Sequence, residues 1–159
     1  ELKKLNENYT TNEWKTYRNE KHGFEFKYPE NLKIEDNLKP YGCVFARKNS
    51  GSNIGWSYLD LCTADSDTYS PSVDFVKWVK NESSEEGVSD AYNFEIGGID
   101  AVRVYHPKSP QTYSAYRIYF LKDKRVYMVF LNNIDSEENS ILQNKILSTF
   151  KFKESLSIW

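Results

Sequence analysis

The stretch WKTYRNEKHGFEFKYPENLKI, residues 14–34, contains the pattern that decides the fold. In FEFKYP, residues 24–29, three aromatic side chains alternate with Glu25 and Lys27, which is the period of a strand with one buried and one solvated face. The preceding NEKHG is typical of a turn, because its glycine tolerates the positive φ that tight turns need. With a short strand over 15–19, the stretch predicts an antiparallel β-hairpin.

His22 lies in the predicted turn, and it raises the alternative of an active site. A catalytic histidine needs a positioned partner, and a second group must fix its tautomer. The neighbours Glu20, Lys21 and Gly23 are all expected to be solvated, so we expect His22 to be an exposed turn residue. His106 is equally isolated in the sequence, and two distant histidines do not make a zinc signature. The stretch is therefore expected to build a sheet and to perform no reaction.

The chain has 159 residues, which is the length of one domain. We expect a polar lead-in or tether over residues 1–13 and a single domain over 14–159. The 21 basic and 23 acidic residues give a net charge of −2, which argues against a general nucleic-acid binder. A removed signal segment or a lipid-accepting cysteine just upstream of Glu1 fits the polar start, and an arbitrary domain boundary fits it equally well.

Cys43 and Cys62 lie in two strand-like runs, CVFARK and IGWSYLDLC, that flank the loop NSGSN. Pairing Asn49 with Ile54 across this loop sets Cys43 opposite Asp60, and a two-residue offset supplied by bulges sets it opposite Cys62. Facing residues of antiparallel strands have Cβ atoms ~4.5–5.5 Å apart, which is close to disulfide geometry. An exported protein favours the bond, whereas a cytosolic one keeps two buried thiols. We expect the disulfide.

Two segments predict helices. SPSVDFVKWVKNES, residues 70–83, has Ser70 as a candidate N-cap followed by a proline, and its apolar residues fall on one face. DSEENSILQNKILSTF, residues 135–150, starts with Asp135 and Glu138 at the spacing of a capping box. Strand-like runs at 91–105, with a break at Gly97–Gly98, and at 112–121, 125–131 and 150–152 complete the order. This order predicts an α+β fold, an antiparallel sheet flanked by helices as an α/β/α sandwich.

The three runs between the helices predict a meander with two distinct faces. With Asp123–Lys124 as a two-residue turn, Tyr119 pairs with Met128, and the loop before the second run pairs Tyr105 with Tyr113. One face is then apolar core, and the other is rich in arginine and tyrosine, which suit recognition surfaces. Its members, our candidate binding residues, are Arg103, Tyr105, Tyr113, Arg117 and Tyr119. The alternative is that another segment covers this face and the arginine stems lie over aromatic rings.

The pattern W-x-x-Y-x-N-x-x-x-G-F-x-F-x-Y-P, from Trp14 to Pro29, resembles the N-terminal signature of PsbP-like domains. The ending ILQNKILSTFKF, residues 141–152, is similar to the C-terminal helix and strand of the same group. The founding members are accessory proteins of the photosynthetic oxygen-evolving complex, and many bacterial members look like secreted lipoproteins. The resemblance implies a sheet with helices on both faces and a binding or accessory role. We match no metal-site motif of that family residue by residue.

The residues contain no nucleophile elbow, phosphate loop or dinucleotide fingerprint, so we expect no cofactor and no metal site. Our first hypothesis is a non-catalytic, extracytoplasmic binding or accessory domain, a membrane-tethered lipoprotein at the cell surface or in the periplasm. Its partner would be a protein or a small ligand, with the membrane involved only through an upstream lipid anchor. An enzyme with a site assembled from dispersed residues, or a structural subunit of an envelope assembly, stays open as an alternative.

Overall fold

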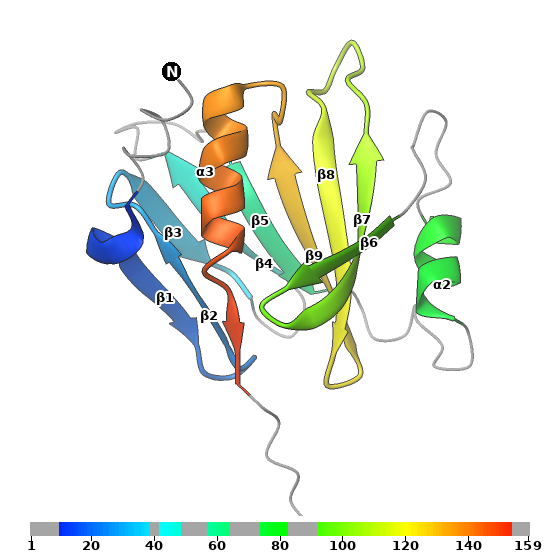
Figure 1. The fold of residues 1–159 in the computed structure, drawn as a ribbon, viewed down its shortest axis with the longest axis horizontal. Helices are drawn as coiled ribbons and strands as arrows, with labels where there is room; N and C mark the ends of the chain where they lie inside the picture. The colour runs from blue at the N-terminus through cyan, green and yellow to red at the C-terminus, as the bar shows by residue number, and fades with distance from the viewer. Residues whose placement is uncertain (1–9, 39–41, 49–56, 64–73, 83–91, 154–159) are drawn as a thin grey trace, which may run out of the picture.

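The computed structural model describes residues 10–38, 42–48, 57–63, 74–82 and 92–153 of the chain. Ten strands and two α-helices lie within these residues, after a 3₁₀ turn over Thr11–Glu13 (Figure 1). The elements are β1 Lys15–Asn19, β2 Phe24–Tyr28, β3 Leu32–Asp36, β4 Cys43–Lys48, β5 Ser57–Thr63, α2 Phe75–Glu82, β6 Tyr92–Ile96, β7 Ile99–His106, β8 Ala115–Lys122, β9 Arg125–Asn132, α3 Glu137–Leu147 and β10 Lys151–Phe152.

The strands form two antiparallel sheets. A three-stranded sheet has the order β1-β2-β10, and a seven-stranded sheet has the order β3-β4-β5-β9-β8-β7-β6. The α+β class is confirmed, but two details of the prediction are wrong. Strand β3 was not predicted, and the run at 91–105 is a hairpin of two strands, because Gly97 and Gly98 both have positive φ and reverse the chain.

The hairpin predicted from residues 14–34 is confirmed. Gly23 has φ +64°, and its N–H donates to the carbonyl of Asn19 over 2.8 Å, which closes the turn. Phe24 and Phe26 are buried, whereas Arg18 of β1 faces Glu25 of β2 on the opposite side of the small sheet. The alternation of residue types therefore decides which side of the hairpin packs on the rest of the domain.

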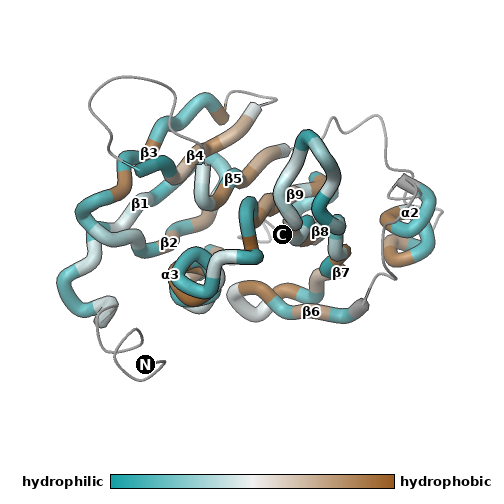
Figure 2. Tube along the Cα trace, turned by 90° about the horizontal axis from the view of Figure 1, so that it is seen from above, coloured by the Kyte–Doolittle hydropathy of each residue, from teal (hydrophilic) through white to brown (hydrophobic). Residues whose placement is uncertain are grey.

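Helices cover both faces of the seven-stranded sheet, as expected (Figure 2). We call the face toward α3 and the hairpin the inner face; its buried members include Ala101, Ile118, Phe120, Tyr127, Val129 and Leu131. We call the face toward α2 the outer face; its buried members include Val102, Val104, Tyr119 and Val126, which pack on Trp78 and Val79 of α2. Neither described helix is long and apolar enough to cross a membrane.

The two helices begin later than the sequence suggests. Helix α3 starts at Glu137, and its N-cap is Ser136, whose side chain accepts a hydrogen bond from the N–H of Asn139. The predicted capping box on Asp135 and Glu138 is therefore shifted by one residue. Helix α2 starts at Phe75; the carboxylate of Asp74 accepts from the N–H of Lys77 over 3.0 Å. The predicted cap at Ser70 and the following proline lie outside the described residues.

Strands β4 and β5 carry the predicted disulfide. Cys43 faces Cys62 in the antiparallel register, their Cα atoms are 4.1 Å apart, and the two sulfur atoms are bonded. Asp60 faces Phe45, because the register shifts between Ala46 and Arg47. An irregularity of the kind invoked from the sequence therefore contributes to bringing the cysteines opposite each other.

Of the two strand pairings predicted for the meander, one is confirmed and the other is wrong. Tyr119 faces Met128 across the turn at Asp123–Lys124, where both residues have positive φ, as a two-residue hairpin turn requires. The pairing of β7 with β8 was predicted wrongly: Tyr105 faces Tyr116 rather than Tyr113, a slip of three residues. Because side chains alternate along a strand, an odd slip exchanges the two faces of β7 relative to β8.

Candidate functional site

Three segments that are distant in the sequence meet at one end of the molecule, at the bottom of Figure 1. They are the β1–β2 turn, the β8–β9 turn and the end of β10. The N–H of Lys153 donates to the carbonyl of Gly23 over 2.9 Å. A Cβ placed on Gly23 would lie 3.4 Å from the Nζ atom of Lys122, so the β8–β9 turn also reaches the first hairpin.

We call this region the basic end and define it as residues 18–25, 122–125 and 151–153. These three segments carry seven lysines and arginines against three acidic residues, a net charge of +4, on a chain whose total is −2. Lys153 pairs with Glu20, and Lys122 pairs with Asp123. The charge is thus concentrated by the fold, since no single segment of the sequence shows it.

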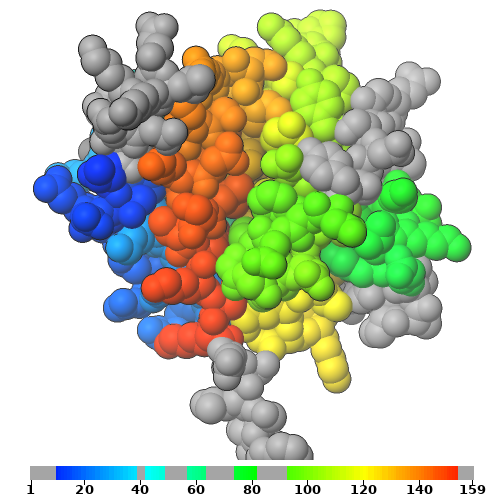
Figure 3. Space-filling view, viewed as in Figure 1, coloured from blue at the N-terminus to red at the C-terminus, as the bar shows by residue number. Residues whose placement is uncertain are grey.

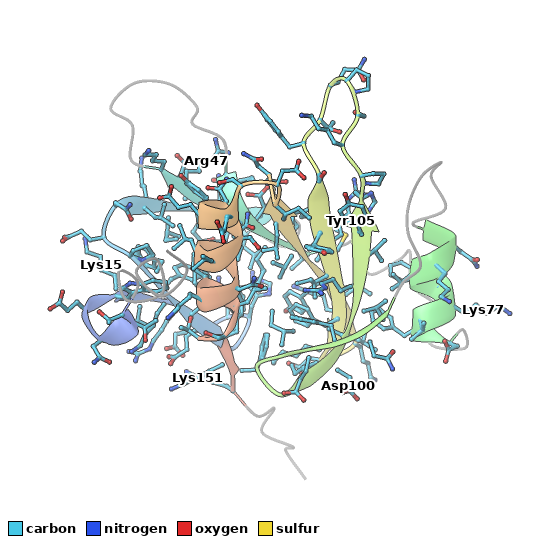
Figure 4. All side chains as sticks on the ribbon, turned by 45° about the horizontal axis from the view of Figure 1, so that its top comes forward. Lys15, Arg47, Lys77, Asp100, Tyr105 and Lys151 are labelled. Atoms are coloured by element: carbon cyan, nitrogen blue, oxygen red, sulfur yellow. A yellow bond between two sulfur atoms is a disulfide. The ribbon has the colours of Figure 1, made fainter. Side chains whose placement is uncertain are left out.

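A pocket of about 260 Å³ opens at the basic end. Its lining includes Phe24 and Phe152 and a rim of charged side chains; the full lining is Arg18, Asn19, Glu20, Phe24, Glu25, Lys151, Phe152 and Lys153. Strand β10 lies between the N-terminal hairpin and the β6–β7 segment, and Lys151 projects from it (Figures 3 and 4). The pocket therefore combines an aromatic surface with charges of both signs.

One cross-strand row sets the electrostatics of the rim. Glu25 faces Arg18 on β1 and Lys151 on β10, so an anion lies between two cations. The Nε atom of Arg18 donates to the Glu25 carboxylate over 2.6 Å, and this hydrogen bond is the main reason that the pKa of Glu25 is lowered. Lys151 and Lys153 act in the same direction. Glu25 is therefore ionised at neutral pH.

His22, in the β1–β2 turn, is buried, with 5% of its surface exposed, so the expectation of a solvated turn residue is wrong. Its Nδ1 atom lies 3.1 Å from the hydroxyl of Tyr127 and 3.4 Å from Nη1 of Arg125. An arginine can only donate, which assigns Nδ1 as an acceptor and the ring proton to Nε2. Burial, followed by the charges of Arg125 and Lys21, lowers the pKa of His22.

A second polar network ties the hairpin to β3. The hydroxyl of Tyr17 donates to the Asp36 carboxylate over 2.6 Å and accepts from the side chain of Asn19 over 3.0 Å. Burial, with the Asp36 carboxylate adding to it, raises the pKa of Tyr17 well above its usual range. The Asn19 side chain also accepts from the backbone N–H of His22 over 2.9 Å, so the turn is held on both sides.

This arrangement can bind but has no evident nucleophile with its base. The hydrogen bonds that His22 makes through Nδ1 go to Tyr127 and Arg125, and no carboxylate is among them. His22 does not line the pocket at the basic end. Within the described residues, no three His, Cys, Asp or Glu side chains are grouped as a metal ion would need.

The five residues predicted to share one binding face do not share one. Arg103 and Tyr105 lie on the inner face, Arg117 and Tyr119 lie on the outer face, and Tyr113 lies in the loop before β8, where it is 56% exposed. The slip between β7 and β8 is the cause. A role in binding for each of these five residues on its own stays a prediction.

Both arginines lie over aromatic rings, which was the alternative left open by the sequence. The guanidinium of Arg103 is 4.4 Å from the ring centre of Tyr116, and that of Arg117 is 5.5 Å from the ring centre of Phe130. Tyr119 is buried. These contacts shield the side chains from solvent and give each a packing role.

The residues of the basic end were missed because their proximity depends on long-range pairing. The alternation in FEFKYP does place Glu25 on the outward side of β2. Nothing local indicates that Lys151 of β10 flanks it, because β10 comes from the other end of the chain. The run FKF at 150–152 was predicted as a strand, but its neighbour in the sheet was not predicted.

Comparison with known proteins supports the fold alone. No family model matches the chain, and no curated protein matches it. Among solved structures, it is similar to the solution structure of cyanobacterial PsbP from Synechocystis sp. PCC 6803, with 15% identity and a TM-score of 0.55 over 88% of this chain and 92% of that one. The chain therefore has a PsbP-like fold, an α+β arrangement of antiparallel sheet and helices.

Proposed function

We propose that this chain is a non-catalytic accessory domain that works outside the cytoplasm and binds a partner through the basic end. The observation that carries the proposal is the bond between Cys43 and Cys62, because disulfides persist in oxidising compartments and are rare in the cytosol. The accessory role is what the resemblance to PsbP-like domains implies, and the aromatic, charged pocket is in keeping with binding rather than reaction chemistry.

A lipid anchor upstream of Glu1 belongs to the same proposal. The chain enters β1 at Lys15, and the basic end begins at the other end of that strand, next to Asn19. An anchor that precedes β1 would hold the entry side of the domain near the bilayer. The basic end would then be directed away from the membrane, where a partner can reach it.

Thiol labelling in cells tests the compartment. The full-length precursor is expressed in its own host, and spheroplasts are treated with a membrane-impermeant maleimide with and without reductant. We expect the native chain to be labelled only after reduction. We expect Cys62→Ser, which leaves Cys43 as a single thiol, to be labelled without reductant. Labelling of the native chain only after lysis, with no reductant needed, would show a reduced cytosolic protein and would overturn the proposal.

A further inference from the structure

We infer that the basic end is a docking site for an acidic protein segment that inserts one aromatic or aliphatic side chain into the pocket formed by Phe24 and Phe152. The inference rests on the proposed binding role but not on the proposed compartment. It names the class of partner, which neither the fold nor the disulfide indicates. Three features of the basic end support it: its cations without ion pairs among the described residues, the size of its pocket, and the two glutamates in the rim.

The first step is the availability of cations. Lys21, Lys124 and Lys151 make no ion pair with any of the described residues, and Lys21, Lys124 and Lys151 are all exposed. They lie on the three segments of the basic end, and Lys151 also lines the pocket. Carboxylates of a partner can therefore pair with them without displacing the pairs Arg18–Glu25 or Lys153–Glu20.

The second step is the size of the pocket. Its volume of about 260 Å³ is below the ~300–1,000 Å³ of sites that enclose drug-sized ligands, and it is open to solvent on one side. A single side chain of a bound segment suits this volume better than a whole cofactor. The rings of Phe24 and Phe152, 6.5 Å apart between centres, both line the pocket, and the half-buried Phe152 offers most of the apolar contact for such an anchor because Phe24 is buried.

The third step excludes other polyanions. Glu20 and Glu25 lie in the rim and would repel the closely spaced phosphates of a nucleic acid, whose binding surfaces are strongly and uniformly positive. Anionic lipid would be attracted to the cations of the basic end, but a flat bilayer surface does not fill a pocket. A protein segment can place its acidic side chains beside the cations and keep them away from Glu20 and Glu25.

The experiment selects the ligand directly. Random twelve-residue peptides are displayed on phage and selected against the folded, disulfide-bonded chain, and the enriched peptides are synthesised. We expect peptides rich in Asp and Glu with one essential apolar residue. We expect replacement of that residue by Ala to weaken Kd at least tenfold, and affinity to fall as salt is raised from 50 to 500 mM.

Two matched variants locate the site. Lys124→Glu with Lys151→Glu reverses two exposed cations of the basic end, and Lys48→Glu with Lys77→Glu makes the same change of net charge elsewhere. We expect the first pair to weaken peptide binding at least tenfold and the second to leave it within twofold. Circular dichroism confirms that both variants fold.

Several outcomes would overturn the inference. They are a selection without acidic enrichment, a selection without any peptide above background, and equal binding by the two variant pairs. Tighter binding of phosphatidylglycerol vesicles or of a single-stranded 20-mer oligonucleotide than of any peptide, lost in Lys124→Glu with Lys151→Glu, would reassign the basic end to a membrane or a nucleic acid. None of these results bears on the thiol labelling, so the two proposals can fail separately.

Discussion

The two faces of the seven-stranded sheet differ in what covers them. The inner face is closed by α3 and by the aromatic side of the hairpin, and Phe26, which is fully buried, stacks on Phe150 with ring centres 4.8 Å apart. The outer face is covered, within the described residues, by α2, and α2 contacts the β7–β9 half of it. The β4–β5 part of the outer face carries the disulfide and the half-buried side chain of Asp60.

A row across the outer face shows the contrast most clearly. Phe45, Asp60, Phe130 and Arg117 face one another in order on four neighbouring strands. One carboxylate oxygen of Asp60 is buried and has no hydrogen-bond partner among the described residues, and burial raises the pKa of Asp60 above its usual range. Along β4, β5, β9 and β8, the buried side chains of the inner face are therefore mainly apolar, whereas the outer face holds half-buried charged side chains.

The largest effect is expected from the inner face. Phe26→Ala removes a fully buried ring and should lower the free energy of unfolding by ~3–5 kcal/mol, measured by urea denaturation. Phe130→Ala, a half-buried ring on the outer face, is the matched control and should cost below ~2 kcal/mol. Equal losses in the two variants would mean that the faces do not differ in the way described.

The next effect is expected from the disulfide, which supports the outer face where α2 does not reach. Cys43→Ser with Cys62→Ser should destabilise the chain by ~2–4 kcal/mol, because it releases a loop of 19 residues in the unfolded state. Thermal unfolding of the native chain with and without reductant gives the same quantity independently. A melting temperature that is unchanged in both measurements would contradict a stabilising role.

A smaller effect is expected from the two stacked arginines. Arg117→Ala should cost ~0.5–1 kcal/mol, because it loses one cation–π contact with Phe130, and Arg103→Ala should cost about twice as much, because it loses contacts with both Phe94 and Tyr116. The two losses should add in the double variant, since the residues lie on opposite faces of the sheet. A coupling above ~0.5 kcal/mol, from urea denaturation of the two single variants and the double variant, would argue against that separation.

The smallest effect is expected in the pH dependence of stability. The pKa of His22 is lowered in the folded state, so the unfolded chain takes up a proton on this residue first as the pH falls. The contribution of His22 to stability is therefore complete above pH ~6.5 and is lost progressively as the pH falls below that value. His22→Gln should reduce the slope of unfolding free energy against pH below ~6.5. An identical slope in both proteins would show that His22 does not titrate differently on folding.

The sequence predicts those contacts that a short turn or a local alternation determines. The β8–β9 register follows from two turn residues, and it was predicted pair by pair. The β7–β8 register failed because eight residues separate His106 from Ala115, and a bridge between Ser109 and Thr112 shortens that loop in a way no local pattern indicates. One such error was enough to divide the predicted binding face.

His22 and the basic end were missed for a related reason. A turn residue is normally solvated, but Tyr127 and Arg125 of β9, about a hundred positions later in the sequence, pack against the imidazole ring of His22 and bury it. The cysteine pair was found because both residues lie on consecutive strands and a small shift of register brings them opposite each other. Prediction from sequence was thus accurate across tight turns and failed for the β7–β8 connection and for segments distant in the sequence.

The pairing of β10 with β2 has a consequence for biosynthesis. Phe24 acquires its sheet neighbour Phe152 only when nearly the whole domain has been made, so the apolar side of the first hairpin stays uncovered on a growing chain. Contacts between such distant positions also slow folding. We therefore expect the domain to complete its fold only after β10 has been synthesised.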